Sequence, residues 1–315
     1  MNSLVFSVNA IAPLFILIAA GYVLKIKRAV DPRFFDMASD FDFKYLFPFI
    51  VFRSIYDMDF VSNFNVTFIA YGIGIAIIFL VLLLVFCPIF IKNKSTCGAF
   101  IHGAFRSNST LMGVALAIIA FGEEGSIATV LFLPFILLTY NILSVIVLTS
   151  FNSENAKVSI KTVLFQIIRN PIIIGAVSGI VVSFSGIELP DFMVSVINSL
   201  ASMATPLALI ALGGELELRN LFARPVLLFS GSFIKLIFAP LLAVVPALLF
   251  FDFTRYEIGA LLFVFAAPTA VSSYPMAKAM KSDTDFAGRI IMHSTVLSAF
   301  TMFLWVYVMK SLNFI

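Results

Sequence analysis

Apolar stretches of about 20 residues, separated by short polar breaks, run through the whole chain. A helix of this length crosses the hydrocarbon core of a bilayer. The pattern predicts ten spans, near residues 4–24, 34–55, 66–91, 98–121, 126–149, 162–184, 191–212, 225–250, 256–278 and 287–309. The second and fourth spans match the pattern least well, because each carries charged residues. Strands of a membrane barrel would alternate apolar and polar residues, so we expect an all-α polytopic membrane protein.

The composition agrees with a membrane protein. Hydrophobic residues make up 61% and charged residues 12% of the 315 residues, whereas a soluble domain has about half and about a quarter. We therefore expect the lipid bilayer as a partner, and no nucleic acid. The basic residues Lys25, Lys27 and Arg28 follow the first span rather than precede it, which favours a retained helix over a cleaved signal peptide. Cys87 and Cys97 are expected to pack as small apolar residues, not as a disulfide.

The basic residues fall mostly on one side of the predicted spans. Thirteen lie in loops or helix ends after odd-numbered spans: Lys25, Lys27, Arg28, Arg33, Lys92, Lys94, Lys157, Lys161, Arg219, Arg224, Lys278, Lys281 and Arg289. Three lie on the other side: Arg53, Arg255 and Lys310. Basic loops stay in the cytoplasm. We therefore expect a protein of the cell membrane whose two termini are both extracytoplasmic.

The two halves of the chain resemble each other. The segment APLFILIAAGYV at 12–23 is similar to NPIIIGAVSGIV at 170–181. Three pairs of identical residues share an offset of 158 positions: Pro13 and Pro171, Gly21 and Gly179, Pro48 and Pro206. We expect two five-helix repeats, residues 1–150 and 162–315, joined by a short cytoplasmic linker at 151–161. An odd number of helices inverts the second repeat, as in many secondary transporters.

Helix breakers and hydroxyl groups interrupt two of the spans. The stretch FAAPTAVSSYPMAKAMKSD, residues 265–283, carries two prolines, and proline removes a backbone donor. The run RSNST at 106–110 offers side chains that compete for backbone hydrogen bonds. Both breaks lie roughly 15–18 Å deep, near the middle of a core about 30 Å thick. Because irregular backbone at that depth needs cover from protein or water, we expect the fourth and ninth spans to be broken helices that cross. A proline kink that only shapes the bundle is the alternative.

The predicted crossing is the candidate substrate site. The candidate substrate-binding residues are Ser107, Asn108, Thr110, Pro268, Thr269, Ser272, Ser273 and Arg106. In this hypothesis, backbone N–H groups freed by the prolines face the substrate together with nearby hydroxyls, and the Asn108 amide does most of the polar work. The segments 105–112 and 266–276 contain no Asp or Glu, which favours an anionic substrate over a cation. Arg106 either pairs with a substrate carboxylate or binds backbone carbonyls and extends towards the cytoplasmic side.

Charged residues elsewhere in the spans are candidates for coupling to H⁺ or Na⁺. Asp36, Asp40 and Lys44 follow at four-residue intervals and share a helix face, and Asp40 and Lys44 have a geometry that suits pairing. They form either a hydrated cytoplasmic mouth or a coupling site. Lys235 lies well inside the span 225–250, where a buried cation is a functional candidate.

The repeat arrangement, however, predicts that Lys235 lies away from the two broken helices and has a structural role. His102 and His293 are expected to be packed polar residues rather than proton relays. We expect no metal site and no cofactor.

Several segments resemble the auxin efflux carrier family, which includes small bacterial carriers related to the plant PIN proteins. The segment RNPIIIGAVSGIVVSFSGIELPDFMVSVINSLASMATPLALIALGGELE at 169–217 is similar to the family's asparagine-proline helix start, its "gxxLP" turn and its "PlaLialG" helix. The segments FIKLIFAPLL at 233–242, APTAVSSYPMAKAM at 267–280 and HSTVLSAFTMFLW at 293–305 resemble its eighth, ninth and tenth spans. The resemblance covers nearly the whole chain.

The resemblance implies ten helices as two inverted repeats in an NhaA-like fold, with the fourth and ninth helices crossing beside the substrate. It also implies transport of small organic anions: auxin in plants, and malate- or malonate-type substrates in bacteria. Ser107 and Ala115 stand where family members often have proline, so the first break is expected to be milder. The short connection at 150–161 lacks the long central loop of plant auxin carriers, so auxin itself is not supported.

These observations predict a secondary transporter, a permease or efflux carrier, of a small organic anion, working by alternating access. A co-transported H⁺ or Na⁺ and a homodimer are left open. A membrane-embedded sensor or a channel is the alternative, although no filter-like repeat or ring of acids is present. No H-E-x-x-H, G-x-S-x-G or clustered His/Cys pattern indicates an enzyme.

Overall fold

The computed structural model describes residues 3–56, 65–151, 169, 171–215, 224–312 and 314. These residues form helices and no strand. The elements are α1 (Ser3–Ile26), α2 (Pro32–Phe41), the π-helical turn η1 (Asp42–Leu46), α3 (Phe47–Tyr56), α5 (Val66–Phe90), α6 (Lys94–Phe105), the π-helical turn η2 (Ser109–Gly113), α7 (Val114–Ser150), α9 (Pro171–Ser185), α10 (Asp191–Glu215), α11 (Pro225–Phe233), the π-helical turn η3 (Ile234–Phe238), α12 (Ala239–Phe250), α13 (Arg255–Ala266), α14 (Ser273–Ala279) and α15 (Thr284–Ser311). The predicted linker 151–161 and the start of the predicted span 162–184 lie almost wholly outside the described residues.

Polar residues define where several helices begin. The side chains of Asn65 and Asn93 accept hydrogen bonds from backbone N–H groups three residues later, at the starts of α5 and α6. Thr254 and Glu257 form a reciprocal capping box at the start of α13. These caps satisfy donors that have no partner inside the helix.

Six of the described helical segments are long and apolar enough to cross a membrane: Ser7–Ile26, Val66–Phe90, Gly125–Ser150, Asp191–Glu215, Pro225–Phe250 and Thr284–Ser311. Each matches one of the ten predicted spans. Of the other four predicted spans, 34–55, 98–121 and 256–278 are divided into shorter elements by a π-helical turn or a break, and 162–184 is described only in part. The described residues are therefore all-helical, with the long apolar helices of a multi-pass membrane protein, and the number ten stays a prediction.

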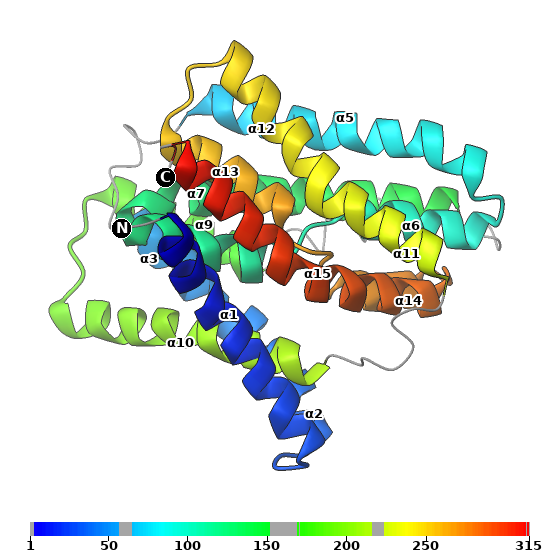
Figure 1. The fold of residues 1–315 in the computed structure, drawn as a ribbon. Coiled ribbons are helices and arrows are strands. Elements are labelled where there is room, and N and C mark those ends of the chain that lie inside the picture. Colours follow the sequence, from blue (N-terminus) through cyan, green and yellow to red (C-terminus); the bar gives the residue numbers. More distant parts are fainter. Residues whose placement is uncertain are drawn as a thin grey trace.

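The helices pack in two groups (Figure 1). On one flank, α10 packs against α1, α2 and α3, and α3 packs against α9. On the other flank, α12 packs against α5 and α13, and α6 and α11 pack against α15. The beginning of α1 and the end of α15 lie at the same end of the molecule, in agreement with termini on one side of the membrane. Which side this is stays a prediction.

Close backbone approaches between α1 and α10 depend on glycine. A Cβ atom on Gly21 would lie 1.9 Å from the carbonyl oxygen of Ile210, and one on Gly213 would lie 1.9 Å from that of Ile18. At the offset of 158 residues, α1 corresponds to α9 and α3 corresponds to α10. The repeat therefore relates the contact between α1 and α10 to the contact between α9 and α3, and both contacts are present. This correspondence agrees with a repeat, although the inverted relation between the halves stays a prediction.

Candidate functional site

Two interruptions meet in the interior of the protein. The helix α6 ends at Phe105 and α13 ends at Ala266. Beyond these ends, Ser107 and Thr269 form an isolated antiparallel bridge. The two short segments that pair there, 106–108 and 267–272, are called the crossing below. The predicted meeting of the two broken helices is thus present in the structure.

Backbone hydrogen bonds hold the crossing together. The Asn108 N–H donates to the Pro268 carbonyl at 2.7 Å, and the Ala270 N–H donates to the Arg106 carbonyl at 3.1 Å. The Thr269 N–H donates to the Ser294 hydroxyl at 3.1 Å. The expectation that freed N–H groups face the substrate is therefore wrong for these three groups. Buried backbone donors nearly always find a partner, and here the two breaks and α15 satisfy each other.

A cavity of about 970 Å³ reaches from the crossing to the connection between α1 and α2. Five of the eight predicted substrate-binding residues line it: Arg106, Ser107, Asn108, Thr110 and Ser272. The other three do not. The Pro268 carbonyl is used in the bridge, the Thr269 hydroxyl donates to the Gly103 carbonyl at 2.8 Å, and Ser273 is buried.

Arg106 is the cationic residue of the crossing. It is 7% exposed, and its guanidinium donates to the Ser272 hydroxyl at 3.1 Å, the Ser144 hydroxyl at 3.4 Å and the Met276 sulfur at 2.9 Å. Among the residues that the structure describes, no carboxylate pairs with it. Neutral oxygens and a thioether sulfur are weaker acceptors than a carboxylate, so this guanidinium can still gain by binding an anion.

Asn108 supplies a donor without an acceptor. Its side-chain Nδ2 is buried and has no hydrogen-bond partner, and the side chain does not cap the helical segment that begins at Ser109. A buried polar atom without a partner is costly and needs an explanation. Because Asn108 lines the cavity, a ligand in that cavity provides one.

Lys235 corrects the prediction that placed it away from the broken helices. It is fully buried in η3, and its Nζ donates to the Ser107 hydroxyl and, at 2.7 Å, to the Phe265 carbonyl. Both acceptors belong to the crossing or to the helix end beside it. The Tyr140 hydroxyl also donates to Ser107, at 3.3 Å. The π-helical turn aims Lys235 inward, and such turns often occur at functional sites.

The predicted pairing of Asp40 and Lys44 is confirmed, at 2.6 Å with both side chains exposed. Sequence reasoning missed Asp42, which lies between them and is 1% exposed. His102 is buried, and His293 contacts the Ser232 hydroxyl at 2.7 Å, as expected for packed polar residues. Cys87 and Cys97 are both free and buried, as predicted.

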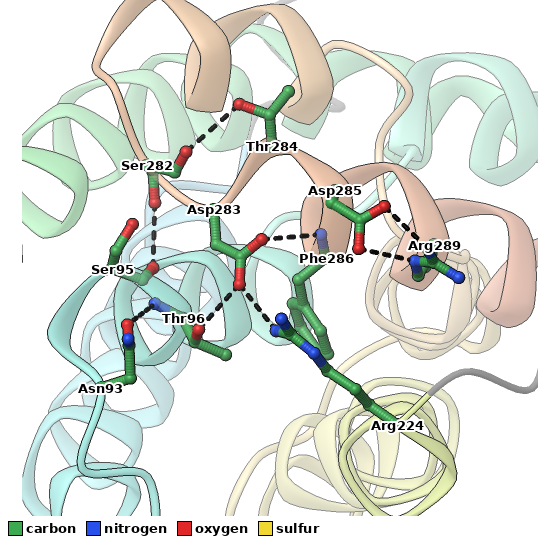
Figure 2. A network of polar contacts seen from close by, with 10 residues as sticks. All are labelled: Asn93, Ser95, Thr96, Arg224, Ser282, Asp283, Thr284, Asp285, Phe286 and Arg289. Atoms are coloured by element: carbon green, nitrogen blue, oxygen red, sulfur yellow. Dashed lines mark hydrogen bonds and ion pairs between the residues drawn. The ribbon is translucent and has the colours of Figure 1, made fainter.

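A second polar group ties the helix ends on the side that is predicted to be cytoplasmic (Figure 2). Asp283, before α15, accepts from the Thr96 hydroxyl at 2.7 Å, from Arg224 at 2.8 Å and from the Phe286 N–H at 3.0 Å. Burial alone would raise the pKa of Asp283, but these three donors together hold that pKa below its usual value. The residues Thr96, Arg224, Asp283 and Phe286 are called the Asp283 cluster below.

The model of the membrane transport protein family, which is the auxin efflux carrier family, matches residues 6–306. The match includes both segments of the crossing and the turn that carries Lys235. The chain belongs to the auxin efflux carrier family. It is therefore a membrane transporter, and the family is one of transporters rather than enzymes. No curated protein matches the chain in sequence.

Proposed function

We propose that this member of the auxin efflux carrier family is a secondary transporter of a small organic anion, a carboxylate of the malate or malonate type. The anion binds at the crossing, near the middle of the membrane, and alternating access exposes it first to one side and then to the other. Ten spans in two inverted five-helix repeats and extracytoplasmic termini belong to the same proposal.

One observation carries this proposal. Arg106 and Asn108 line the same cavity, and both have donor capacity that no described carboxylate uses. Lys235 adds a second cation beside them. The crossing segments contain no Asp or Glu, so the site has an excess of positive charge and of hydrogen-bond donors. A carboxylate has the charge and the acceptors that such a site lacks.

The conformation of the cavity supports alternating access. It reaches the end of α1 through Lys25 and the start of α2 through Pro32. The basic-residue count predicts that this end is cytoplasmic, and the proposal therefore takes this conformation as inward-open. Transport requires a second state in which this path closes and one on the opposite side opens.

Counterflow in proteoliposomes tests the function. Vesicles that contain the purified protein and unlabelled malonate or malate should accumulate the labelled anion transiently, because a carrier exchanges its substrate across the membrane. A channel would equilibrate the label without counterflow, and a sensor would bind the anion without moving it. A panel of mono- and dicarboxylates should first be compared by thermal shift, because a ligand of the folded state raises its apparent stability. Absence of both binding and exchange across the panel would refute the proposal.

A further inference from the structure

Asp42 is a buried acid in the wall of the cavity that leads to the crossing. It is the first residue of η1, its side chain is 1% exposed, and it lines the 970 Å³ cavity together with Arg106 and Asn108. Its Oδ1 atom has no hydrogen-bond partner. The cavity wall thus contains a carboxyl group that no described residue neutralises.

The elements packed against η1 do not offer Asp42 a partner. These elements are α2, α3, α9 and α10. Their charged groups, among the described residues, are Arg33, Asp36 and Asp40 on α2, Arg53 on α3, and Asp191 and Glu215 on α10. None of them forms a described hydrogen bond or ion pair with Asp42. The charged groups that line the cavity with it are Lys25, Asp36, Asp40, Arg106 and Glu215.

Two hydrogen-bond donors near Asp42 in the sequence are already engaged. Lys44, on the same turn, pairs with Asp40. Ser39, one turn earlier, donates its hydroxyl to Glu215. Moving a carboxylate out of water without a partner costs far more than moving the neutral acid. A single proton removes that cost by neutralising the carboxylate. A metal cation bound to Asp42 would need several further oxygen ligands around the cation.

We propose that Asp42 is the proton-binding residue that couples anion binding in this cavity to proton uptake. The inference rests on the proposed anion transport. One proton converts the carboxylate into the neutral acid, which removes one negative charge from a wall that also holds Asp36, Asp40 and Glu215. The anion then passes this wall to reach Arg106 with less repulsion. Release of the anion and the proton on the other side returns Asp42 to the carboxylate form.

Coupling of this kind is reciprocal. If the proton increases the affinity for the anion, the anion must increase the affinity for the proton by the same factor. One proton taken up per anion bound makes the affinity rise by at most about tenfold for each unit by which the pH falls. The expected signature is therefore a pH-dependent affinity that disappears when Asp42 can no longer titrate.

The first experiment needs no ligand. Infrared difference spectra of the purified full-length protein at pH 7, comparing the wild type with Asp42→Asn, should show the carbonyl stretch of a protonated carboxylic acid in the wild type only. Asp285→Asn, an exposed acid paired with Arg289 outside the cavity, should keep the band. A wild-type spectrum without a band assignable to Asp42 would overturn the proposal.

The second experiment uses malonate as the probe, between pH 6.5 and 8.5. Calorimetry in buffers of different ionisation enthalpy should show little proton uptake at pH 6.5, where the free protein already holds the proton, and uptake that rises towards one proton per malonate at pH 8.5. Affinity should fall with rising pH over the same range, by up to about tenfold per unit. Asp42→Asn should bind malonate with no proton uptake and no pH dependence. Asp40→Asn should retain both, and their loss there instead would overturn the assignment to Asp42.

Three other results separate the inference from the proposed function. If malonate binds the wild type at pH 8.5 without proton uptake, the coupling is wrong while anion binding stands. If Na⁺ alone raises the melting temperature of the wild type but not of Asp42→Asn, the site holds sodium and the proton assignment is wrong. If no carboxylate of the panel binds, the proposed function fails, and the infrared band still decides whether Asp42 holds a proton.

Discussion

The crossing and the Asp283 cluster use similar side chains in opposite ways. Both join the ends of helices that are distant in the sequence, and both combine an arginine with hydroxyl groups. In the Asp283 cluster, one carboxylate receives three donors and the charges balance (Figure 2). At the crossing, two cations and an unpartnered amide converge, and no carboxylate is present.

This difference separates a structural contact from a site prepared for a ligand. A saturated polar cluster stabilises the fold and gains nothing from a further group. A cluster with spare donors costs stability while it is empty and gains from an anion that supplies the acceptors. Substitutions in the two regions should therefore affect different properties: anion binding and flux at the crossing, and stability at the Asp283 cluster.

The largest effect is expected from Arg106→Gln. The guanidinium can give an anion two charge-assisted hydrogen bonds, each worth about 1.5–3 kcal/mol. Their loss should weaken carboxylate binding by at least about a hundredfold. Binding to the purified protein should be measured by calorimetry. Arg106→Lys keeps the positive charge but not the paired donors of the guanidinium, so its affinity should lie between those of the wild type and Arg106→Gln. Unchanged affinity in Arg106→Gln would show that the anion does not use this residue.

Asn108→Ala should have the next largest effect. It removes a buried donor that has no protein partner, so the fold should lose little while the anion loses one charge-assisted hydrogen bond. Affinity should fall by about tenfold to a hundredfold. Asn198 on α10 is the matched control, because it is half-buried, its buried Oδ1 also lacks a partner, and it lies outside the cavity. Asn198→Ala should leave affinity unchanged, and an equal loss in both variants would contradict the site.

The sequence predicted the position of the crossing because its signals are local. Proline and clustered hydroxyls interrupt a helix wherever it packs, so the runs 106–110 and 267–275 marked both breaks. Apolar run length likewise predicted six segments that are long enough to cross a membrane. The partners of the freed N–H groups could not be predicted, because Asn108, Thr269 and Ala270 bond to residues far away in the sequence.

The π-helical turns account for the other differences from the predictions. Regular spacing placed Asp36, Asp40 and Lys44 on one face, and it drew attention away from Asp42. The turn η1 starts at Asp42, and this acid lies in the wall of the cavity. The turn η3 in the same way brings Lys235 to the crossing. No residue type signals a π turn clearly, so a 3.6-residue period misplaces these side chains.

Lys235→Met sharpens the comparison by separating function from stability. A buried ammonium without a carboxylate is costly to desolvate, and methionine has a similar length and no charge. The thermal midpoint should therefore stay the same or rise, while flux per folded molecule should fall by about tenfold because the cation beside Ser107 is lost. Lys92→Met, at an exposed position, should change neither. A variant that loses stability but keeps its flux would restore the structural role first predicted for Lys235.

Asp283→Asn is expected to have the smallest effect on transport and a clear effect on stability. An asparagine can still accept from the Phe286 N–H, but its amide group would face two donors, the Thr96 hydroxyl and Arg224. The free energy of unfolding should fall by about 1–2 kcal/mol, which lowers the thermal midpoint by a few degrees. Asp285→Asn, which breaks only the exposed pair with Arg289, should cost about 0.5 kcal/mol or less.

The pH dependence checks that the charge of Asp283 causes this effect. Since the pKa of Asp283 is lowered in the folded state from the ordinary 3.8, its contribution is fully present above that value and is lost as the pH falls through the lower folded-state pKa. The stability difference between the wild type and Asp283→Asn should be equal at pH 7 and pH 5 and should shrink below pH 3.8.

The affinity of Asp283→Asn for malonate at pH 7 should match that of the wild type within about twofold, since the Asp283 cluster does not line the cavity. A variant that is stable but binds malonate weakly would show that the two regions are coupled.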